Sequence, residues 1–263
     1  MGTAAVGVTA ASAEVGTTGD KTAMFPFASV TKLLTALASL VAAEEGVVEL
    51  DEPAGPPGST VRHLLAHASG LPPEGELPIA QPGARRIYSN SGFEVLAKVV
   101  AVGAEMPFPE YLRLAILEPL GLSASLDGSP ASGITGTLGD LLALGRELLA
   151  PRLIAPETLT EATAVAFPGL TGVLPGFGRM EPNDWGLGFE LRDEKRPHWT
   201  GERNFPRTFG HFGQSGSFLW VDPNAGLACG CLSDRGFGDW AKEAWPRLSD
   251  AVLAESSGTG AAV

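Results

Sequence analysis

The sequence is poor in positive charge and contains no long hydrophobic run. Its 263 residues include 18 lysines and arginines against 30 aspartates and glutamates, which gives a formal net charge of −12 at pH 7. A chain this negative repels phosphate backbones and anionic lipids. The longest mostly apolar run, residues 33–43, is about half of what a helix needs to cross a bilayer. We therefore expect neither a nucleic-acid partner nor a membrane partner.

Cysteine is almost absent. Cys229 and Cys231 are the only two, and a disulfide between cysteines two residues apart in a strand-like run would be badly strained. The first residues, Met-Gly-Thr-Ala-Ala, contain neither the basic stretch nor the apolar segment of a secretory signal. Free thiols without such a signal are typical of a reducing compartment. We therefore expect a cytoplasmic protein, unless a leader precedes this sequence.

What is present favours a globular chain with a large core. Hydrophobic residues make up 44% of the sequence and charged residues 18%, which is too apolar for a disordered chain. The length fits one large domain or two lobes.

Strand patterns lie at both ends of the sequence and helical patterns lie between them. Strand composition is found at residues 4–10, 13–18, 185–191, 217–221 and 227–233. Helical spacing is found at residues 29–46, 61–68, 93–103, 109–117, 138–150 and 239–255. The segment Asp222-Pro-Asn-Ala-Gly226 has the turn chemistry of a hairpin between the last two strands.

This order predicts an α+β fold, with an antiparallel β-sheet flanked by helices and an inserted all-helical lobe. The sheet lobe would combine residues 1–50 with residues 175–263, and the helical lobe would hold residues 51–174. Residues 256–263 are predicted to form a disordered tail.

Three short motifs carry the candidate chemistry. The first is Ser29-Val-Thr-Lys32, at the start of a predicted helix. Residues three apart share a helix face, so the hydroxyl and the amine lie within reach of each other. The helix N-terminus and burial should both lower the pKa of Lys32, so that a neutral amine can accept the serine proton. Taken alone, an N-cap serine beside a solvent-facing lysine is the better interpretation.

The second motif is Tyr88-Ser89-Asn90, which follows a loop and precedes a helix. A phenol near Lys32 could relay the proton to a leaving group, and the Asn90 amide could hold an acyl carbonyl. The alternative is a half-buried tyrosine beside a turn, with Asn90 or Ser91 capping the helix.

The third motif is His211-Phe212-Gly213, which is followed by Gln214 and leads into a strand. Glycine lets the backbone approach a ligand closely. His211 could donate to a phenol or to substrate, and the N–H of Gln214 could pair with that of Ser29 to bind an oxyanion. The alternative is a glycine-rich turn with an incidental histidine.

Each motif is a weak signal by itself, but the three in this order are a strong one. With them, the chain resembles the serine β-lactamase and penicillin-binding superfamily, in its class C β-lactamase, DD-peptidase and esterase branch. Further matching segments are Val61–Leu71, Glu118–Gly121, Leu138–Leu142, Trp185–Phe189 and Phe218–Pro223. The resemblance covers about residues 4–255.

The resemblance implies a β-lactamase/transpeptidase-like fold with the site between the sheet and the helical lobe. By this resemblance Ser29 is the acylated nucleophile, and Lys32 and Tyr88 move protons. No metal and no cofactor is implied.

The same resemblance assigns the substrate-orienting positions. Asn90 and His211 would orient substrate beside Gly213. The N–H groups of Ser29 and Gln214 would form the oxyanion hole.

One departure from the family pattern bears on the substrate. Many relatives carry a hydroxyl residue that helps bind a substrate carboxylate where this chain has Phe212. This favours uncharged acyl substrates, and hence a serine hydrolase that cleaves an ester or amide bond as a carboxylesterase. A β-lactamase or DD-peptidase remains the alternative, and a non-catalytic ligand-binding module is the alternative of another class.

Three further expectations can be tested on a structure. His63 and His67, four apart on a predicted helix, have a spacing that can bind zinc, but Leu64 stands where a metalloprotease has its glutamate, so a structural role is preferred. If His211 must be neutral, activity should fall in acid near a histidine-like pKa. Aromatic residues that could line an apolar acyl pocket, or equally well be core, are Trp185, Trp199, Phe205, Phe209 and Phe212.

Overall fold

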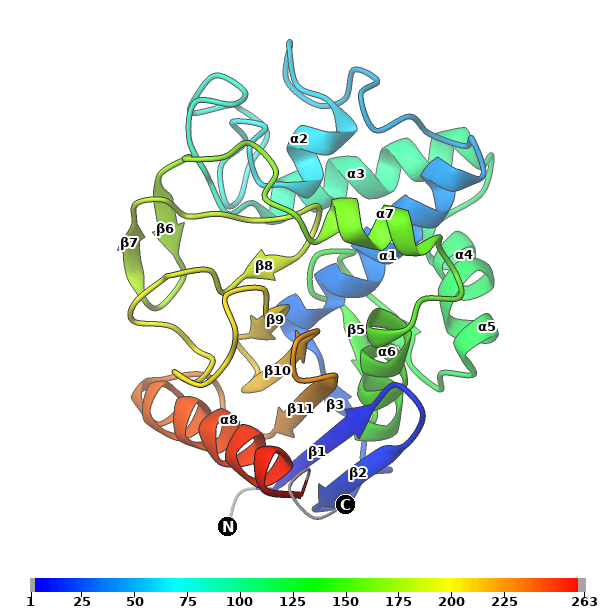
Figure 1. Ribbon diagram of the computed structural model, residues 1–263. Helices are drawn as coiled ribbons and strands as arrows, with labels where there is room; N and C mark the ends of the chain where they lie inside the picture. Colours follow the sequence, from blue (N-terminus) through cyan, green and yellow to red (C-terminus); the bar gives the residue numbers. More distant parts are fainter. Residues whose placement is uncertain (1–2, 260–263) are drawn as a thin grey trace.

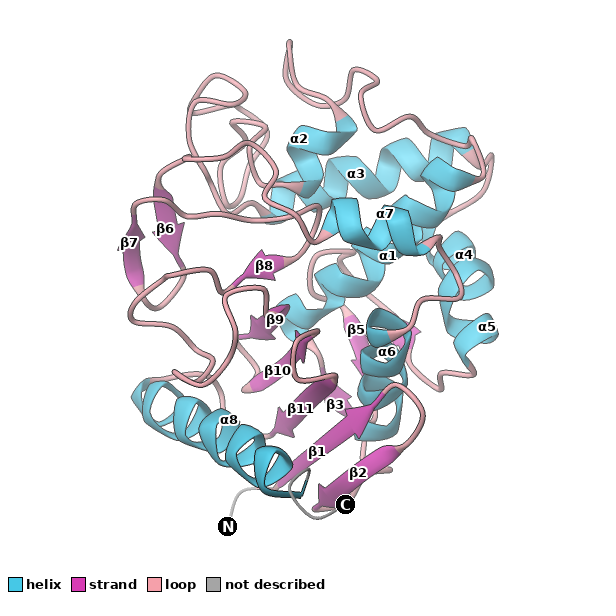
Figure 2. Ribbon diagram, viewed as in Figure 1, coloured by secondary structure: helices cyan, strands magenta, loops and turns pink. Residues whose placement is uncertain are grey.

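The computed structural model describes residues 3–259 (Figures 1 and 2). The strands are β1 (Ala4–Ala10), β2 (Glu14–Thr18), β3 (Phe25–Pro26), β4 (Ser125–Leu126), β5 (Ile134–Gly136), β6 (Gly172–Leu174), β7 (Gly178–Met180), β8 (Glu190–Leu191), β9 (Phe209–Gly213), β10 (Ser217–Asp222) and β11 (Leu227–Ser233). The helices are η1 (Ala28–Val30), α1 (Thr31–Glu44), α2 (Val61–Leu65), α3 (Asn90–Gly103), α4 (Phe108–Leu112), η2 (Arg113–Leu117), α5 (Glu118–Leu120), α6 (Leu138–Leu149), α7 (Pro156–Ala162) and α8 (Asp239–Thr259).

The main sheet joins strands from both ends of the chain. Its six strands have the order β2-β1-β11-β10-β9-β8 and pair antiparallel throughout. The N-terminal strand β1 pairs with the late strand β11, and β10 and β11 form the predicted hairpin. The predicted α+β fold with an antiparallel sheet is therefore confirmed.

Alternation along β10 separates two layers of core. Phe218 and Trp220 pack with α8 on one face, whereas Leu219 and Val221 join the core on the α1 and α6 face. The Trp220 indole donates to Ser249 Oγ of α8 at 3.0 Å. In Figure 1, α8 covers one face of the sheet and α6 lies on the other.

Helix α1 connects the sheet to the helical part of the molecule. It contacts β9 near its start and α3, α4 and η2 further along. Leu33, Leu34 and Leu37 are buried, and so are nearly all of the remaining residues of this helix. The first residues of α1 are therefore fixed in a rigid environment beside β9.

Helix α6 does not pack where the predicted lobe boundaries place it. The boundaries 51–174 assign it to the helical lobe, but α6 packs on β1, β10 and β11. Glycine makes this close contact possible, because a Cβ at Gly145 would lie 2.9 Å from the Cβ of Ala228. It follows that α6 is a flanking helix of the sheet.

Two predicted elements need correction, and one helix was not predicted. The strand expected at 185–191 is reduced to Glu190–Leu191, because Gly188 adopts φ +87° and passes directly against Ala36 of α1. Helix α7 had no predicted counterpart. The disordered tail expected from residue 256 is wrong for 256–259, where α8 continues, and residues 260–263 lie outside the described residues.

Among the helices of residues 3–259, none combines the length and the hydropathy that a membrane span requires.

Candidate active site

Ser29 lies in the short helix η1, directly before α1, and is partly exposed. Its neighbour Ala28 has φ +46°, a left-handed conformation that costs energy for a residue with a Cβ. This sharp entry leaves the Ser29 N–H without a hydrogen-bond partner among the described residues. The serine therefore presents both its hydroxyl and its amide at one point.

The β9–β10 hairpin is tied to the chain just before Ser29. Ser215 Oγ donates to the Pro26 carbonyl at 2.8 Å, and Ser217 Oγ donates to the Phe27 carbonyl at 2.7 Å. A Cβ at Gly213 would lie 2.6 Å from the Phe27 carbonyl oxygen, so only glycine permits this approach. The N–H of Gln214, at the tip of the hairpin, is likewise unpaired within residues 3–259. The two amides that could bind an oxyanion are thus brought to one region.

Lys32 is fully buried one turn after Ser29. Its Nζ donates to Asn90 Oδ1 at 2.6 Å and to the Ala131 carbonyl at 2.8 Å, and it lies 4.7 Å from the centre of the Tyr88 ring. Burial lowers the pKa of Lys32 to about 7, against the opposing pull of Glu74 and Glu94. A neutral amine has two N–H groups and one lone pair, so two donated hydrogen bonds leave the lone pair free to accept a proton.

The second motif is held in place by its own middle residue. Ser89, not Asn90 or Ser91, caps α3, because its Oγ accepts from the Gly92 N–H at 2.9 Å. Asn90 Nδ2 donates to Glu74 Oε1 at 2.6 Å. The amide expected to hold an acyl carbonyl is therefore also fixed between Lys32 and Glu74.

Tyr88 completes the group around Ser29. Burial raises the pKa of its hydroxyl, with the nearby Ser29 acting against this shift, so the phenol stays protonated at neutral pH. The hydroxyl is enclosed, yet within residues 3–259 no hydrogen bond of good geometry reaches it. A protonated, unpaired phenol can receive and pass on a proton.

His211 lies opposite Tyr88, with 5.7 Å between the ring centres. Its Nδ1 donates to the Phe212 carbonyl at 2.6 Å, so the unpaired Nε2 carries a lone pair. Burial and the charge of Lys32 lower the pKa of His211 to about 3. His211 therefore stays neutral throughout the working range, and the acid limb expected from His211 is better assigned to Lys32, whose pKa lies near neutrality.

These groups surround one cavity of about 110 Å³. Of the predicted site residues, Ser29, Tyr88, Asn90, His211 and Gln214 line it, while Lys32 lies outside the lining and contacts Tyr88 and Asn90. The remaining lining residues are Leu174, Pro175, Trp185, Glu190 and Phe212.

The predicted aromatic pocket is only partly right. Trp185 and Phe212 line the cavity. Trp199 packs in the core under α8, and Phe209 packs edge-on against Phe189 in the other core. Phe205 is 47% exposed and lies outside the cavity lining.

Several residues near the site carried no signal in the sequence. The buried guanidinium of Arg86 donates to the carbonyls of Ala66, Asn183 and Ala166, which fixes the loop before Tyr88. Glu74 and Glu190 add two carboxylates whose proximity to the site depends on long-range folding. No local spacing would have revealed them.

The histidine pair has partners other than a metal. His63 Nδ1 bonds to Thr60 Oγ1 at 2.9 Å, whereas His67 Nδ1 accepts from the Ser89 N–H at 3.1 Å. The part of the chain that the structure describes holds no group of three His, Cys, Asp or Glu residues able to bind a metal. Cys229 and Cys231 are buried free thiols whose pKa values are raised by burial, so neither is a ready nucleophile.

Comparison with known proteins identifies the family to which the chain is similar. A family model described as Beta-lactamase matches residues 2–126 and 122–253. The crystal structure of a β-lactamase from Mycobacterium bovis is 55% identical with a TM-score of 0.95, over 97% of this chain and 95% of that one. A hydrolase with promiscuous acyltransferase activity, EstCE1, is 18% identical with a TM-score of 0.77, over 95% of this chain and 93% of that one, a likeness of fold alone.

Among curated proteins, penicillin-binding protein 4* of Bacillus subtilis is 26% identical over 133 residues, which is 38% of this chain. The match spans only 30% of the length of that relative. The family model nevertheless covers residues 2–253, which include all three motifs. The chain belongs to the β-lactamase family of serine hydrolases.

Proposed function

We propose that the chain is a carboxylesterase that works through an acyl-enzyme on Ser29. The observation that carries the proposal is the state of Lys32. It is a buried amine with a pKa of about 7 and two hydrogen bonds to acceptors, one turn from a partly exposed serine. This is the arrangement that a general base for a hydroxyl needs at neutral pH.

The proton path follows from the neighbours of Lys32. Ser29 Oγ attacks the ester carbonyl while its proton passes to Lys32 Nζ, directly or through the Tyr88 hydroxyl. The N–H groups of Ser29 and Gln214 bind the developing oxyanion. When the carbon–oxygen bond breaks, the same proton goes to the departing alkoxide. Water then attacks the acyl-enzyme while one of its protons passes to the base, and that proton moves on to Ser29 Oγ as the bond to the acyl carbon breaks, which releases the acid and restores free Ser29 and neutral Lys32.

An ester substrate is favoured by the lining of the cavity. Leu174, Trp185 and Phe212 are apolar residues of its lining, and its volume of about 110 Å³ holds only a short acyl group. Phe212 supplies no hydroxyl for a substrate carboxylate, and His211 carries no charge. A β-lactamase is the second candidate, because the protein that is 55% identical is described as one; a DD-peptidase stands beside it, and a non-catalytic binding module is the candidate of another class.

We further propose a small-molecule acyl ester as the only partner required, and a cytoplasmic location. The net charge of −12 supports the absence of nucleic acid and of an anionic membrane surface as partners.

The test compares the protein with its Ser29→Ala variant on p-nitrophenyl acetate, p-nitrophenyl butyrate and nitrocefin. Intact-mass spectrometry with a fluorophosphonate then shows whether Ser29 is modified. We expect a phosphonyl adduct on Ser29, ester turnover in preference to nitrocefin, and a loss of at least about a thousandfold in Ser29→Ala. Faster turnover of nitrocefin would favour the β-lactamase instead. No adduct and no turnover would leave the non-catalytic module.

A further inference from the structure

His67 binds the backbone on both sides of Tyr88. The Ile87 N–H donates to the His67 carbonyl at 2.9 Å, and the Ser89 N–H donates to His67 Nδ1 at 3.1 Å. The imidazole also packs on the Tyr88 ring, with 4.7 Å between the ring centres and 42° between the planes. One residue therefore contacts the tyrosine and both of its neighbours in the chain.

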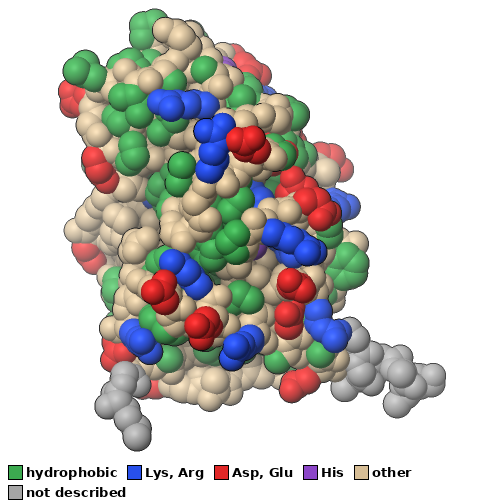
Figure 3. Space-filling view, turned by 90° about the vertical axis from the view of Figure 1, so that its left-hand side faces the viewer, with side chains coloured by type: hydrophobic (Ala, Val, Ile, Leu, Met, Phe, Trp, Pro, Cys, Tyr) green, Lys and Arg blue, Asp and Glu red, His purple; other side chains and the backbone are tan. Residues whose placement is uncertain are grey.

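His67 is itself held in place just after α2. The Ala66 carbonyl before it accepts from the Arg86 guanidinium. The Ala68 carbonyl after it accepts from the Gly83 N–H at 2.8 Å. His67 is 1% exposed, and on the face shown in Figure 3 histidine is visible only as small purple areas. The residue is therefore a fixed support for the segment that precedes α3.

Packing alone does not explain a histidine at this position. Its φ of +54° is left-handed, which costs energy for a residue with a Cβ. Its Nε2 is buried and, within residues 3–259, has no hydrogen-bond partner, which costs stability as well. A phenylalanine could fill the same space beside Tyr88, Phe93 and Trp185 without the second cost. What the histidine adds is the acceptor at Nδ1.

The hydroxyl of Tyr88 needs support from elsewhere in the molecule. It has to lie close to Ser29 to pass on a proton, yet among the described residues no hydrogen bond of good geometry holds it. Its position therefore depends on the ring and on the backbone that carries the ring. Displacing a proton-transferring group by about 1 Å can cost about a hundredfold in rate.

We propose that His67 is a positioning residue for the proton-transferring phenol, and that its two hydrogen bonds to the Ile87 and Ser89 N–H groups set the place of the Tyr88 hydroxyl. The inference rests on the proposed esterase function. It gives His67 no contact with substrate, because the residue lies outside the lining of the cavity around Ser29.

The proposal requires a neutral His67 with its proton on Nε2. Only this tautomer has a lone pair on Nδ1 for the Ser89 N–H. Burial, helped by the charge of Lys32, lowers the pKa of His67 well below its ordinary value, so the ring is neutral over the working range. His211 has the opposite tautomer, since its Nδ1 donates to the Phe212 carbonyl. The two histidines beside the phenol therefore differ in a measurable property.

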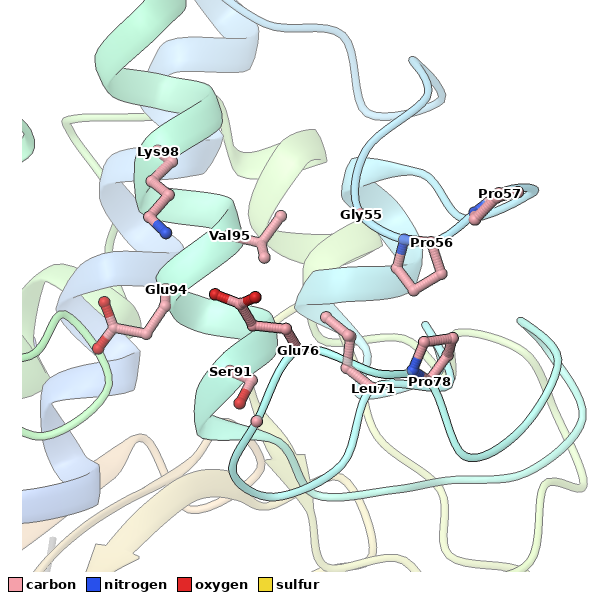
Figure 4. A pocket seen from close by; sticks show the side chains of 11 residues that line it. Gly55, Pro56, Pro57, Leu71, Glu76, Pro78, Ser91, Glu94, Val95 and Lys98 are labelled. Atoms are coloured by element: carbon pink, nitrogen blue, oxygen red, sulfur yellow. The ribbon is translucent and has the colours of Figure 1, made fainter.

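The loop between His67 and α3 does not provide the same support. Ser89 Oγ donates to the Pro72 carbonyl at 2.6 Å, which fixes the first turn of the helix. Further along the loop, a cavity of about 500 Å³ lies between residues 75–78 and α3 (Figure 4). This cavity shares no lining residue with the catalytic one. It follows that the chain ahead of the tyrosine depends on His67.

The test uses two substitutions that separate packing from hydrogen bonding. His67→Phe keeps a ring of similar size but has no acceptor. His67→Asn loses most of the ring but keeps an acceptor oxygen on Cγ, and asparagine tolerates a left-handed φ. The substrates are p-nitrophenyl acetate, whose leaving group departs without a proton, and benzyl acetate, whose alkoxide needs one. We compare kcat/KM because it reports the acylation step.

We expect His67→Phe to lower kcat/KM for benzyl acetate about a hundredfold, through kcat, and to lower it about tenfold less for p-nitrophenyl acetate. His67→Asn should be at least about tenfold faster than His67→Phe on benzyl acetate. A role in packing alone would reverse this order, because phenylalanine fills the site better than asparagine. Circular dichroism corrects each rate for the folded fraction.

The matched control is His63→Phe, on the same side of the catalytic cavity. His63 Nδ1 bonds to Thr60 Oγ1 and its ring packs against Phe167, so both rates should be unchanged. Equal losses for the two esters in His67→Phe, or a His67→Asn variant no faster than His67→Phe, would overturn the proposal. Failure of the esterase function looks different, since the parent protein would then turn over neither ester.

A measurement on the unsubstituted protein covers the case in which His67→Phe does not fold. ¹⁵N NMR of the histidine rings distinguishes the two neutral tautomers, and the His67 signals are identified by their absence from His67→Asn. We expect a proton on Nε2 of His67 and on Nδ1 of His211. A proton on Nδ1 of His67 would overturn the proposal, because the Ser89 N–H would then have no acceptor there. This measurement does not depend on turnover.

Discussion

Two buried clusters of polar side chains meet the catalytic cavity, and they differ in how completely their hydrogen bonds are used. Around Glu190, the Lys195 Nζ donates to Oε1 at 2.5 Å and to the Asp184 carbonyl at 2.6 Å. Glu190 Oε2 accepts from the Trp199 indole and contacts His198 Nε2, both at 2.9 Å. Burial alone would raise the pKa of Glu190, but the charges and hydrogen bonds of His198 and Lys195 hold it at about 2.

In the cluster around Lys32, by contrast, several buried polar atoms lack a hydrogen-bond partner. Within residues 3–259, the Tyr88 hydroxyl, His211 Nε2 and His67 Nε2 are buried without a hydrogen-bond partner. An unpaired buried polar atom lowers stability, and it is tolerated where a ligand or water supplies the missing partner. We infer that the Glu190 cluster holds the fold together, and that the Lys32 cluster is left open for substrate. Matched substitutions of the two lysines can test this contrast.

The largest effect is expected for Lys32→Met. Methionine keeps the length and burial of the side chain but cannot accept a proton, so kcat/KM for p-nitrophenyl acetate should fall at least about a thousandfold. Methionine removes the cost of burying the amine but leaves Asn90 Oδ1 and the Ala131 carbonyl without their donor, so the free energy of unfolding should fall by no more than about 2 kcal/mol. Initial rates and urea denaturation measure the two quantities. Activity within tenfold of the parent protein would show that Lys32 is not the base.

Lys195→Met should give the opposite result. Without Lys195, the Glu190 carboxylate loses its ammonium partner in a buried position, which should cost about 3 kcal/mol of unfolding free energy. The rate per folded molecule should change by less than about tenfold, because Lys195 does not line the cavity. A variant that is stable but inactive would instead place the Glu190 cluster in the chemistry.

The stability that Lys195→Met removes should depend on pH, and its sign follows from the pKa of Glu190. The pKa of Glu190 is about 2 in the folded protein and 4.5 as its ordinary value. The stabilisation is therefore fully present above pH 4.5 and is lost as pH falls towards 2. Urea denaturation should show a difference between the parent protein and Lys195→Met that is large at pH 7 and smaller at pH 3.

Much of the fold could be predicted because its signals are local. Alternation in residues 217–221 and 227–233, with turn residues between them, predicted β10 and β11 within one residue of their bounds. The helix that begins near Ser29 was predicted from apolar spacing and Gly46, which does take a left-handed φ of +71°. The strand expected at 185–191 was wrong because its pattern ignored the contact of Gly188 with α1. Such a contact depends on the tertiary packing and has no local sequence signature.

In the candidate site, too, the residues of local motifs could be predicted, whereas features that depend on tertiary packing could not. Ser29, Lys32, Tyr88 and His211 were found from motif spacing, and in the structure three of them line one cavity while Lys32 lies against Tyr88. Depth of burial could not be predicted from spacing, and for that reason the pH expectation was assigned to His211 and not to Lys32. The carboxylate of Glu74 escaped notice because it reaches Asn90 from a loop 16 residues away.

The smallest predicted effect concerns Glu74 itself. Of the groups around Lys32, Glu74 and Glu94 oppose the effect of burial on its pKa, while His211 is neutral. Glu74→Gln keeps an oxygen to accept from the Asn90 amide but removes the negative charge. The pKa of Lys32 should therefore fall, and the acid limb of log kcat/KM, expected near pH 7, should move to lower pH by roughly half a pH unit.

The profile should be recorded from pH 5 to 9 at low salt, where exposed charges act over the longest range. The matched control is Glu76→Gln, a substitution of equal charge on the same loop that does not act on Lys32. The rate at high pH should be unchanged in both variants, because the neutral amine is then fully formed. An acid limb that stays in place in Glu74→Gln, or moves equally in Glu76→Gln, would show that this carboxylate does not set the protonation of Lys32.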